Sequence, residues 1–328
     1  MIRDPFQPVR IGVAGAGNFG SLHAVTMAGL GEAELVALVD RDEDTLGKLP
    51  PQLSEVPRWN NLETALKKSG AEAWVVATST ASHMPVAKTI LEAGLPVLVE
   101  KPITGDLESG ESIQPLIKPD SSNFMMGHIL LFGSEFRVLR RELEQRGPVV
   151  FINSVRHRSI PHLERYPGEP PLRLGMIHDL YMMFALTGGH DPISYSYVRH
   201  KTHKAEEDVS LVTLKWADGT LASIVASYLT PVSMYEDGFD RLEVFGDGWV
   251  ARSHPVPRPV EVWADRARWP SIYEICMEDN TPSGMLAEED RHFCRVVRGQ
   301  AQVPFAARYE DAIQIEGWLK KLEESAED

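Results

Sequence analysis

A glycine-rich segment near the N-terminus constrains the fold of this chain more than any other feature. Gly15, Gly17 and Gly20 form the pattern G-x-G-x-x-G. They stand between an apolar run typical of a buried strand, Val9–Ala14, and a stretch with helical periodicity, Asn18–Gly29. At such a junction the first glycine permits a tight turn, the second lets the main chain approach a diphosphate, and the third lets the helix pack closely on the strand. The pattern predicts a dinucleotide-binding turn.

An acidic residue follows at the spacing that such a turn requires. Asp40 ends the next predicted strand, Glu34–Val39, and lies 20 residues after Gly20. Its carboxylate is expected to accept hydrogen bonds from the adenosine ribose and to repel a 2′-phosphate, which favours NAD as the cofactor. The guanidinium of Arg41 would instead hold a 2′-phosphate, so NADP remains the alternative.

The pattern of apolar residues changes at about residue 125. Before that point apolar strands such as Ala73–Ala77 alternate with helical segments, which predicts βαβ units and a parallel sheet. After it β-type runs follow one another, and Asp218-Gly219 joins two of them as a hairpin turn. We predict an α/β fold with an N-terminal Rossmann dinucleotide-binding domain over residues 1–125. Residues 126–328 are expected to form a C-terminal α+β domain with a mainly antiparallel open sheet, whose terminal helices pack there or back on the first domain.

The hairpin strands are apolar on both faces. Val209 and Leu211 alternate with Val212 and Leu214, whereas the helices of a two-layer domain cover only one face of its sheet. An uncovered apolar face is typical of a protein–protein interface. We therefore predict a homodimer or homotetramer formed through the C-terminal sheet; the alternative is that a loop covers this face.

Composition excludes several classes of partner. The net charge of −14 disfavours nucleic acid, whose binding requires a cationic face. No apolar run reaches the roughly 18 residues of a membrane span, and the N-terminus lacks a signal-peptide pattern. Cys276 and Cys294 suit a reducing compartment and support neither a disulfide framework nor a cysteine metal site. We predict a cytoplasmic protein with a small-molecule substrate, no membrane contact and no metal.

Two loops at the carboxyl ends of predicted strands carry groups suited to ligand binding, since open α/β sheets bind ligands there. Residues 78–83 read Thr-Ser-Thr-Ala-Ser-His and open a helix, so their hydroxyls either cap that helix or line the dinucleotide site. Glu100-Lys101-Pro102 follows the strand Pro96–Val99 and is expected to point an amine into the cleft; the alternative is a surface ion pair. The residues predicted to bind the dinucleotide are Gly15, Ala16, Gly17, Asn18, Phe19, Gly20, Asp40, Arg41, Thr78, Ser79, His83, Glu100 and Lys101.

The chain resembles the Gfo/Idh/MocA oxidoreductases, which include glucose–fructose oxidoreductase and inositol dehydrogenase. The resemblance rests on the glycine turn, residues 78–83, Glu100-Lys101-Pro102, Gly127-His128 and Gly175-Met176-Ile177-His178-Asp179. It implies hydride transfer between a nicotinamide and a hydroxyl or carbonyl of a sugar, sugar derivative, sugar nucleotide or cyclitol. It also implies two catalytic residues: Lys101 would hydrogen-bond the reacting oxygen, and His178 would share its acid–base work.

The chemistry agrees with these roles. Oxidising a carbinol requires its proton to leave, which a base titrating near neutrality does best, and a cationic Lys101 would stabilise the developing alkoxide. One departure concerns Leu174, because the family usually has aspartate four residues before His178. Asp179 is a nearby carboxylate, but adjacent helix residues point about 100° apart. The residues predicted to contact the substrate are His128, Arg156, Arg158 and Asp179, with a solvated basic loop as the alternative for the arginines.

These features favour an NAD(P)-dependent dehydrogenase that acts on CH–OH groups. Two alternatives stay open. Leu174 would suit a dinucleotide-binding sensor or regulatory protein with impaired catalysis. The other alternative is a family enzyme that holds its NAD tightly and recycles it internally.

Overall fold

The computed structural model describes residues 7–159, 161–162, 169–201, 207–231, 239–255, 262–263, 267–268, 276–278 and 281–327. The chain forms two compact units. Unit 1 consists of residues 1–129 and 275–316, and unit 2 of residues 130–274 and 317–328. The sequence predicts a domain boundary at residue 125 and does not decide on which domain the terminal helices pack. In the structure, residues 275–316, which contain the first terminal helix, belong to unit 1.

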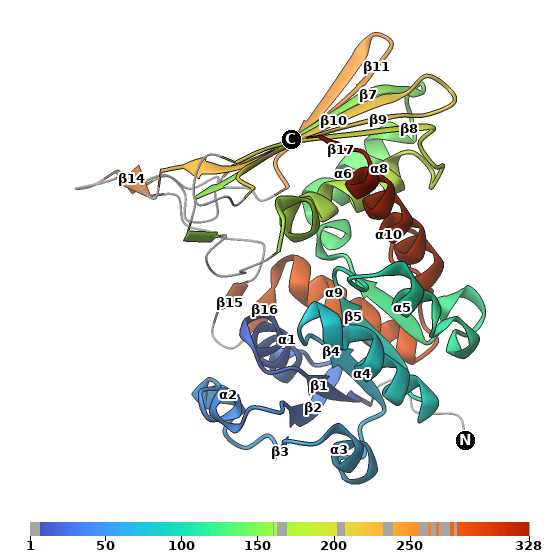
Figure 1. Cartoon of the computed structure of the whole chain (residues 1–328). Coiled ribbons are helices and arrows are strands. Elements are labelled where there is room, and N and C mark those ends of the chain that lie inside the picture. Colours follow the sequence, from blue (N-terminus) through green and yellow to red (C-terminus); the bar gives the residue numbers. More distant parts are fainter. Residues whose placement is uncertain are drawn as a thin grey trace. The chain divides into compact units, whose positions relative to one another are not determined.

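Unit 1 is built on a parallel sheet of six strands (Figure 1). The strand order β3-β2-β1-β4-β5-β6 is that of a Rossmann fold, which binds its ligand where the order reverses between β1 and β4. Val, Ile, Leu and Ala fill most positions of β1, β4 and β5, because a parallel sheet is buried on both faces. The strands are β1 (Val9–Ala14), β2 (Ala33–Val39), β3 (Arg58–Trp59), β4 (Ala73–Val76), β5 (Val97–Glu100) and β6 (Phe124–Gly127).

Helices pack on this sheet. Helix α1 contacts β1, β2, β4 and the later helix α9, while α4 contacts β4 and β5. Side chains cap several of the shorter helices; Asn61, for example, accepts a hydrogen bond from the Thr64 N–H at the start of α3. The helices of unit 1 are α1 (Asn18–Gly29), α2 (Glu43–Gly47), α3 (Leu62–Lys68), α4 (Thr80–Glu92), α5 (Leu107–Glu111) and α9 (Gly284–Val297). Helix α10 (Tyr309–Glu324) begins in unit 1 and ends in unit 2.

Unit 2 is built on a seven-stranded mixed sheet of order β12-β11-β7-β10-β9-β8-β17. Its pairs are antiparallel except for β7 with β10 and β8 with β17, which are parallel. The strands are β7 (Val149–Ser159), β8 (Ser194–His200), β9 (Val209–Lys215), β10 (Leu221–Thr230), β11 (Phe239–Gly246), β12 (Trp249–Ser253) and β17 (Ala326–Glu327). Its helices are α6 (Ser134–Leu143), a π-helical turn (Leu172–Met176) that leads into α8 (Ile177–Leu186), and the end of α10.

Short ladders complete the described residues: β13 (Val262–Trp263) pairs with β14 (Ala267–Arg268), and β15 (Cys276–Glu278) with β16 (Thr281–Ser283). The predicted fold class is confirmed, including the hairpin, in which Lys215 of β9 lies opposite Leu221 of β10. Among the described residues no helix has both the length and the apolarity needed to cross a bilayer.

Candidate active site

The glycine turn between β1 and α1 has the geometry that its sequence predicts. Gly15 has φ +93°, and a Cβ on it would lie 2.4 Å from the Ala77 carbonyl oxygen. A Cβ on Gly20 would lie 1.9 Å from the Gly15 carbonyl oxygen, so only glycine lets α1 approach the turn this closely. By contrast, a Cβ on Gly17 would meet no described atom within 4 Å. The turn therefore leaves open space at its middle glycine, where the main chain would meet a diphosphate.

Helix α1 offers main-chain donors at this point. Its first hydrogen bond runs from the Ser21 N–H to the Gly17 carbonyl (2.8 Å), so the N–H groups of Asn18, Phe19 and Gly20 have no acceptor within the helix. Such groups, together with the helix dipole, attract an anion. The residues present thus fit the diphosphate of a dinucleotide.

Asp40 is tied to the same turn. One carboxylate oxygen accepts the Ala16 N–H at 2.8 Å, and the other accepts the Asp42 N–H at 3.0 Å. Because a carboxylate has about four acceptor positions, both oxygens keep capacity for a ribose hydroxyl. Arg41, next to it, is exposed. These contacts hold the Asp40 carboxylate beside the glycine turn, and recognition of the ribose stays a prediction.

His83 joins the two loops that the sequence singles out. Its Nδ1 lies 2.8 Å from the Pro102 carbonyl oxygen, and its Nε2 lies 3.2 Å from that of Thr78. Burial lowers the pKa of His83, which keeps the imidazole neutral at physiological pH. Ser79 is the N-cap residue of α4, yet its side chain makes no capping hydrogen bond; its hydroxyl instead faces that of Ser82 at 3.3 Å. Capping therefore does not occupy the Ser79 hydroxyl, and its contact with a ligand stays a prediction.

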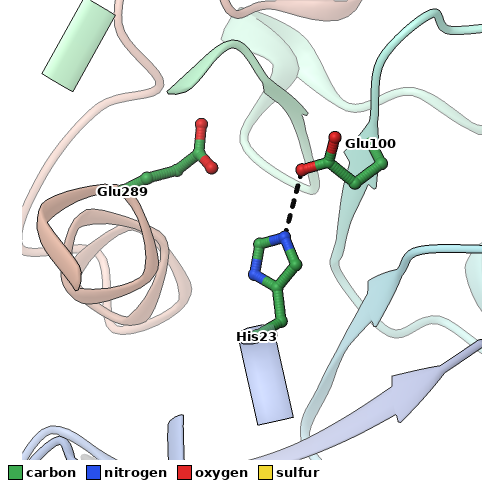
Figure 2. Close-up of side chains that lie close together, drawn as sticks. All are labelled: His23, Glu100 and Glu289. Carbon is green, nitrogen blue, oxygen red and sulfur yellow. Dashed lines mark hydrogen bonds and ion pairs between the residues drawn. The ribbon is translucent and has the colours of Figure 1, made fainter. Parts of the chain in front are cut away.

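Lys101 follows a carboxylate that points into the protein. Glu100 is buried, with one oxygen 3.0 Å from Nε2 of His23, while the other accepts the Lys101 N–H at 3.2 Å. Nδ1 of His23 lies 2.8 Å from Asp290 Oδ1. Glu289, also buried, directs its carboxylate toward the same imidazole (Figure 2). Four ionisable groups from α1, β5 and α9 thus meet beneath the Lys101 loop, all of them within unit 1.

In unit 2, His178 pairs with a tyrosine. Both residues lie on α8, three positions apart, and Nδ1 of His178 is 2.8 Å from the hydroxyl of Tyr181. That hydroxyl also accepts the Leu130 N–H at 3.1 Å. A polar group therefore orients the His178 ring although position 174 carries leucine.

The arginines predicted to line a substrate site lie in a buried ion-pair network. Arg156 donates to both carboxylate oxygens of Asp179, at 3.0 and 3.1 Å, and to Asp240 at 2.8 Å. Arg158 donates to Asp240 at 2.6 and 2.9 Å, and Ser154 donates to Asp179 at 2.7 Å. Two guanidinium groups balance two carboxylates, and the network links β7 and β11 to α8. It anchors the helix that carries His178, and substrate contact by these residues stays a prediction.

His128 is buried at the end of β6, with Nδ1 against the Ala306 carbonyl oxygen. Burial lowers its pKa to about 4, so this imidazole is neutral at physiological pH. Its predicted substrate contact is likewise untested. Unit 2 also contains a hollow of about 490 Å³ lined by Trp216, His190 and Asp218 among others, and none of the motif residues takes part in it.

Comparison with known proteins identifies the N-terminal domain. Residues 9–128 match the group described as "Oxidoreductase family, NAD-binding Rossmann fold". These residues are therefore similar to the NAD-binding domain of the Gfo/Idh/MocA oxidoreductases. The match confirms the predicted NAD-binding Rossmann domain and agrees with the prediction of an oxidoreductase.

Named relatives extend the match. The chain is 25% identical over 223 residues to inositol 2-dehydrogenase of Corynebacterium glutamicum (strain R), an alignment that spans 66% of each chain, just under two thirds. It is 25% identical over 219 residues to UDP-N-acetylglucosamine 3-dehydrogenase of Acidithiobacillus ferrooxidans, with 67% of each chain covered. A crystal structure of scyllo-inositol dehydrogenase from Lactobacillus casei, with NAD(H) and scyllo-inositol bound, superposes with a TM-score of 0.82 at 19% identity over 97% of each chain.

Sequence reasoning missed the groups that support the motifs of the candidate site. His23 lies on the buried side of α1. From the sequence alone, a histidine in a predicted helix does not indicate which side chains it contacts. Asp290 and Glu289 are adjacent acids on α9, far from the glycine turn in the sequence, and no sequence pattern pairs them with His23. Tyr181 could have been found from the sequence, because it lies three positions after His178 and side chains at that spacing on a helix are neighbours.

Proposed function

We propose that this protein is an NAD-dependent dehydrogenase that oxidises a secondary hydroxyl of a cyclitol, sugar or sugar nucleotide, or reduces the corresponding ketone. The observation that carries the proposal is the glycine turn, which leaves an open main-chain cradle at Gly17 beside the fixed carboxylate of Asp40. Relatives named for inositol and for UDP-N-acetylglucosamine support the substrate class.

The protein's own residues divide the work. When bound, NAD supplies the hydride acceptor. The main chain at residues 15–20 and Asp40 would hold the dinucleotide, with Thr78, Ser79 and His83 along its path. Lys101 would donate a hydrogen bond to the substrate oxygen and stabilise its developing negative charge. His178, oriented by Tyr181, would accept the proton that the hydroxyl loses.

Calorimetry followed by a substrate panel tests the proposal. We expect NAD to bind the purified chain, and Asp40→Ala to weaken NAD binding by about tenfold while changing NADP binding less. Turnover is then followed by NADH absorbance with inositols, free sugars and UDP-sugars. A well-folded chain that binds neither NAD nor NADP would rule out the function.

Leu174 is the observation that favours a second candidate, a dinucleotide-binding sensor with impaired catalysis. Binding of NAD without turnover of any member of the panel would support the sensor. NAD that copurifies, resists dialysis and is reduced and reoxidised within one turnover would instead indicate an enzyme that recycles its cofactor internally.

We also propose that the protein forms a homodimer or homotetramer through the open face of the unit 2 sheet. Val198, Leu211, Val225 and Val155 lie opposite one another on four neighbouring strands and form an apolar row. Val198 and Leu211 are each 40% exposed. Burying such a row on a second copy removes apolar surface from water. Sedimentation that shows only monomer at micromolar concentration would contradict this, and Leu211→Lys should weaken the assembly. A cytoplasmic location stays a prediction.

A further inference from the structure

The buried histidine beneath the Lys101 loop meets a carboxylate at each ring nitrogen. Nδ1 of His23 lies 2.8 Å from Asp290 and Nε2 lies 3.0 Å from Glu100. An ionised carboxylate only accepts hydrogen bonds, so both contacts are satisfied when both nitrogens carry protons. Burial alone lowers the pKa of His23, but the charges of Asp290 and Glu100 outweigh it and raise the pKa well above its usual range. His23 is therefore an imidazolium that links two carboxylates.

Glu289 is the group in the cluster without a partner. It is fully buried, and neither of its carboxylate oxygens has a hydrogen-bond partner among the described residues. Burial, followed by the charge of Glu100, raises the pKa of Glu289 well above its usual range, so it is a neutral acid. This lowers the surplus of negative charge around the imidazolium, which in a buried site would otherwise be costly.

A cation is the competing explanation of the same cluster. His23, Glu100 and Glu289, the side chains drawn in Figure 2, each offer a potential ligand atom, and these atoms lie within 4.8 Å of one another. However, both nitrogens of His23 already lie at hydrogen-bond distance from carboxylate oxygens. Two protons on the ring account for this geometry without an ion.

Glu100 connects the cluster to the main chain of Lys101. The oxygen that does not face His23 accepts the Lys101 main-chain N–H at 3.2 Å. Gly127 on the neighbouring strand leaves the space for this carboxylate, because a Cβ there would lie 2.7 Å from Glu100 Oε1. A carboxylate held at one end by an imidazolium and at the other by a main-chain N–H has little freedom to rotate.

We propose that His23 and Asp290 are positioning residues for Lys101: the imidazolium, held by Asp290, fixes the Glu100 carboxylate, which in turn holds the main chain at Lys101. The proposal rests on the proposed function in so far as Lys101 acts on the substrate. It also links α1, the helix whose N-terminus faces the diphosphate cradle, to the residue that would contact the reacting oxygen.

Two substitutions of one residue separate the two contacts. His23→Gln keeps an amide donor at the distance of Nε2, toward Glu100, whereas His23→Asn keeps one at the distance of Nδ1, toward Asp290. Both variants lose the same positive charge. We expect His23→Asn to lower kcat by up to about 100-fold, with the Kd for NAD within about threefold of wild type and a much smaller loss of kcat in His23→Gln. Equal losses of kcat that follow equal losses of stability would reduce His23 to a structural role and overturn the proposal.

A second readout does not require turnover. The rate at which the Lys101 amine is acylated, measured by mass spectrometry on the intact protein, reports its surroundings directly. We expect His23→Asn to change this rate and His23→Gln to preserve it. If the rates differ while no substrate is turned over, the positioning role stands and the proposed function fails. If turnover is present and neither kcat nor the acylation rate distinguishes the variants, the function stands and the positioning role fails.

Metal analysis completes the test. We expect the wild-type protein, purified without chelator, to contain no stoichiometric divalent metal. One equivalent of metal that is lost in Glu289→Gln would assign the cluster to a cation and overturn the imidazolium linkage.

Discussion

The two units contain clusters of buried charge that differ in balance. In unit 2, two guanidinium groups face two aspartates: the pair of Arg156 with Asp179 holds α8 to the sheet, and the pairs with Asp240 join β7 to β11. In unit 1, one imidazolium faces three carboxylic groups, one of which has no partner among the described residues. Balanced networks serve the fold, whereas a surplus of like charge that the fold must tolerate is typical of a functional site. The difference suggests that unit 2 uses its buried charges for architecture, and unit 1 uses them to hold a reactive loop.

The largest expected effect separates function from stability in unit 1. Lys101→Ala should lower kcat by about 10²- to 10⁴-fold, because the oxygen of the substrate loses its hydrogen-bond donor and its countercharge. The melting temperature and the calorimetric Kd for NAD should stay near wild type, since the side chain of Lys101 is partly exposed at a loop. Retained turnover would remove Lys101 from the chemistry.

The matching substitution in unit 2 should affect stability more than turnover. Arg156→Met leaves Asp179 and part of Asp240 as buried charges without their main partner, which costs about 3–5 kcal/mol of unfolding free energy. Denaturant unfolding measures this loss. Arg146→Met is the control, because that arginine forms an exposed pair with Glu142 and its loss should cost little. If Arg156→Met were as stable as wild type, the network would not be architectural.

The sequence predicted the framework of unit 1 because its signals are local. Gly15, Gly17, Gly20 and Asp40 lie within 26 consecutive residues and follow the strand–turn–helix pattern, so one helix and two strands suffice to place them. The partners of His23 lie 77 and 267 residues away. Only the packing of α9 on α1 brings Asp290 to the ring, and no periodicity in either helix encodes it.

Unit 2 shows the same limit in another form. The sequence predicted its hairpin from Asp218-Gly219 and its exposed apolar face from alternation. Arg156 and Arg158 were expected to offer free positive charge, because a sequence shows charges but not their pairing. Asp240, which binds both, lies more than 80 residues later on β11.

The charge surplus of unit 1 should appear in the pH dependence of stability. The folded state raises the pKa of His23, Glu289 and Asp290, so it binds more protons than the unfolded chain. For His23 the stabilisation is complete below the unfolded pKa of about 6.5 and is lost as pH rises through the raised value. The two carboxyls act in the same direction, their contribution falling as pH rises from about 4 toward their raised values.

The unfolding free energy should therefore fall as pH rises from about 7 to 9, by about 1.4 kcal/mol per pH unit for each extra proton held. Calorimetric melting across this range measures the slope. His23→Gln and Glu289→Gln should each flatten it, whereas His128, whose pKa is lowered to about 4, contributes only on the acid side. A slope that is flat in the wild type would show that the cluster holds no extra proton.

The smallest expected effect concerns His178 and Tyr181, where unit 2 would take part in the reaction. Tyr181→Phe removes the hydroxyl that faces Nδ1 of His178 and accepts the Leu130 N–H, at a cost of about 1 kcal/mol in each role. We expect kcat to fall by about fivefold, because the ring keeps its packing but loses its orienting partner. The Tyr181 hydroxyl would orient His178 as a carboxylate at position 174 would. In that case Leu174→Asp should restore part of the lost kcat in the Tyr181→Phe background and change kcat little in the wild type. Equal effects of Leu174→Asp in both backgrounds would show that a carboxylate at position 174 and the Tyr181 hydroxyl do not share one orienting role.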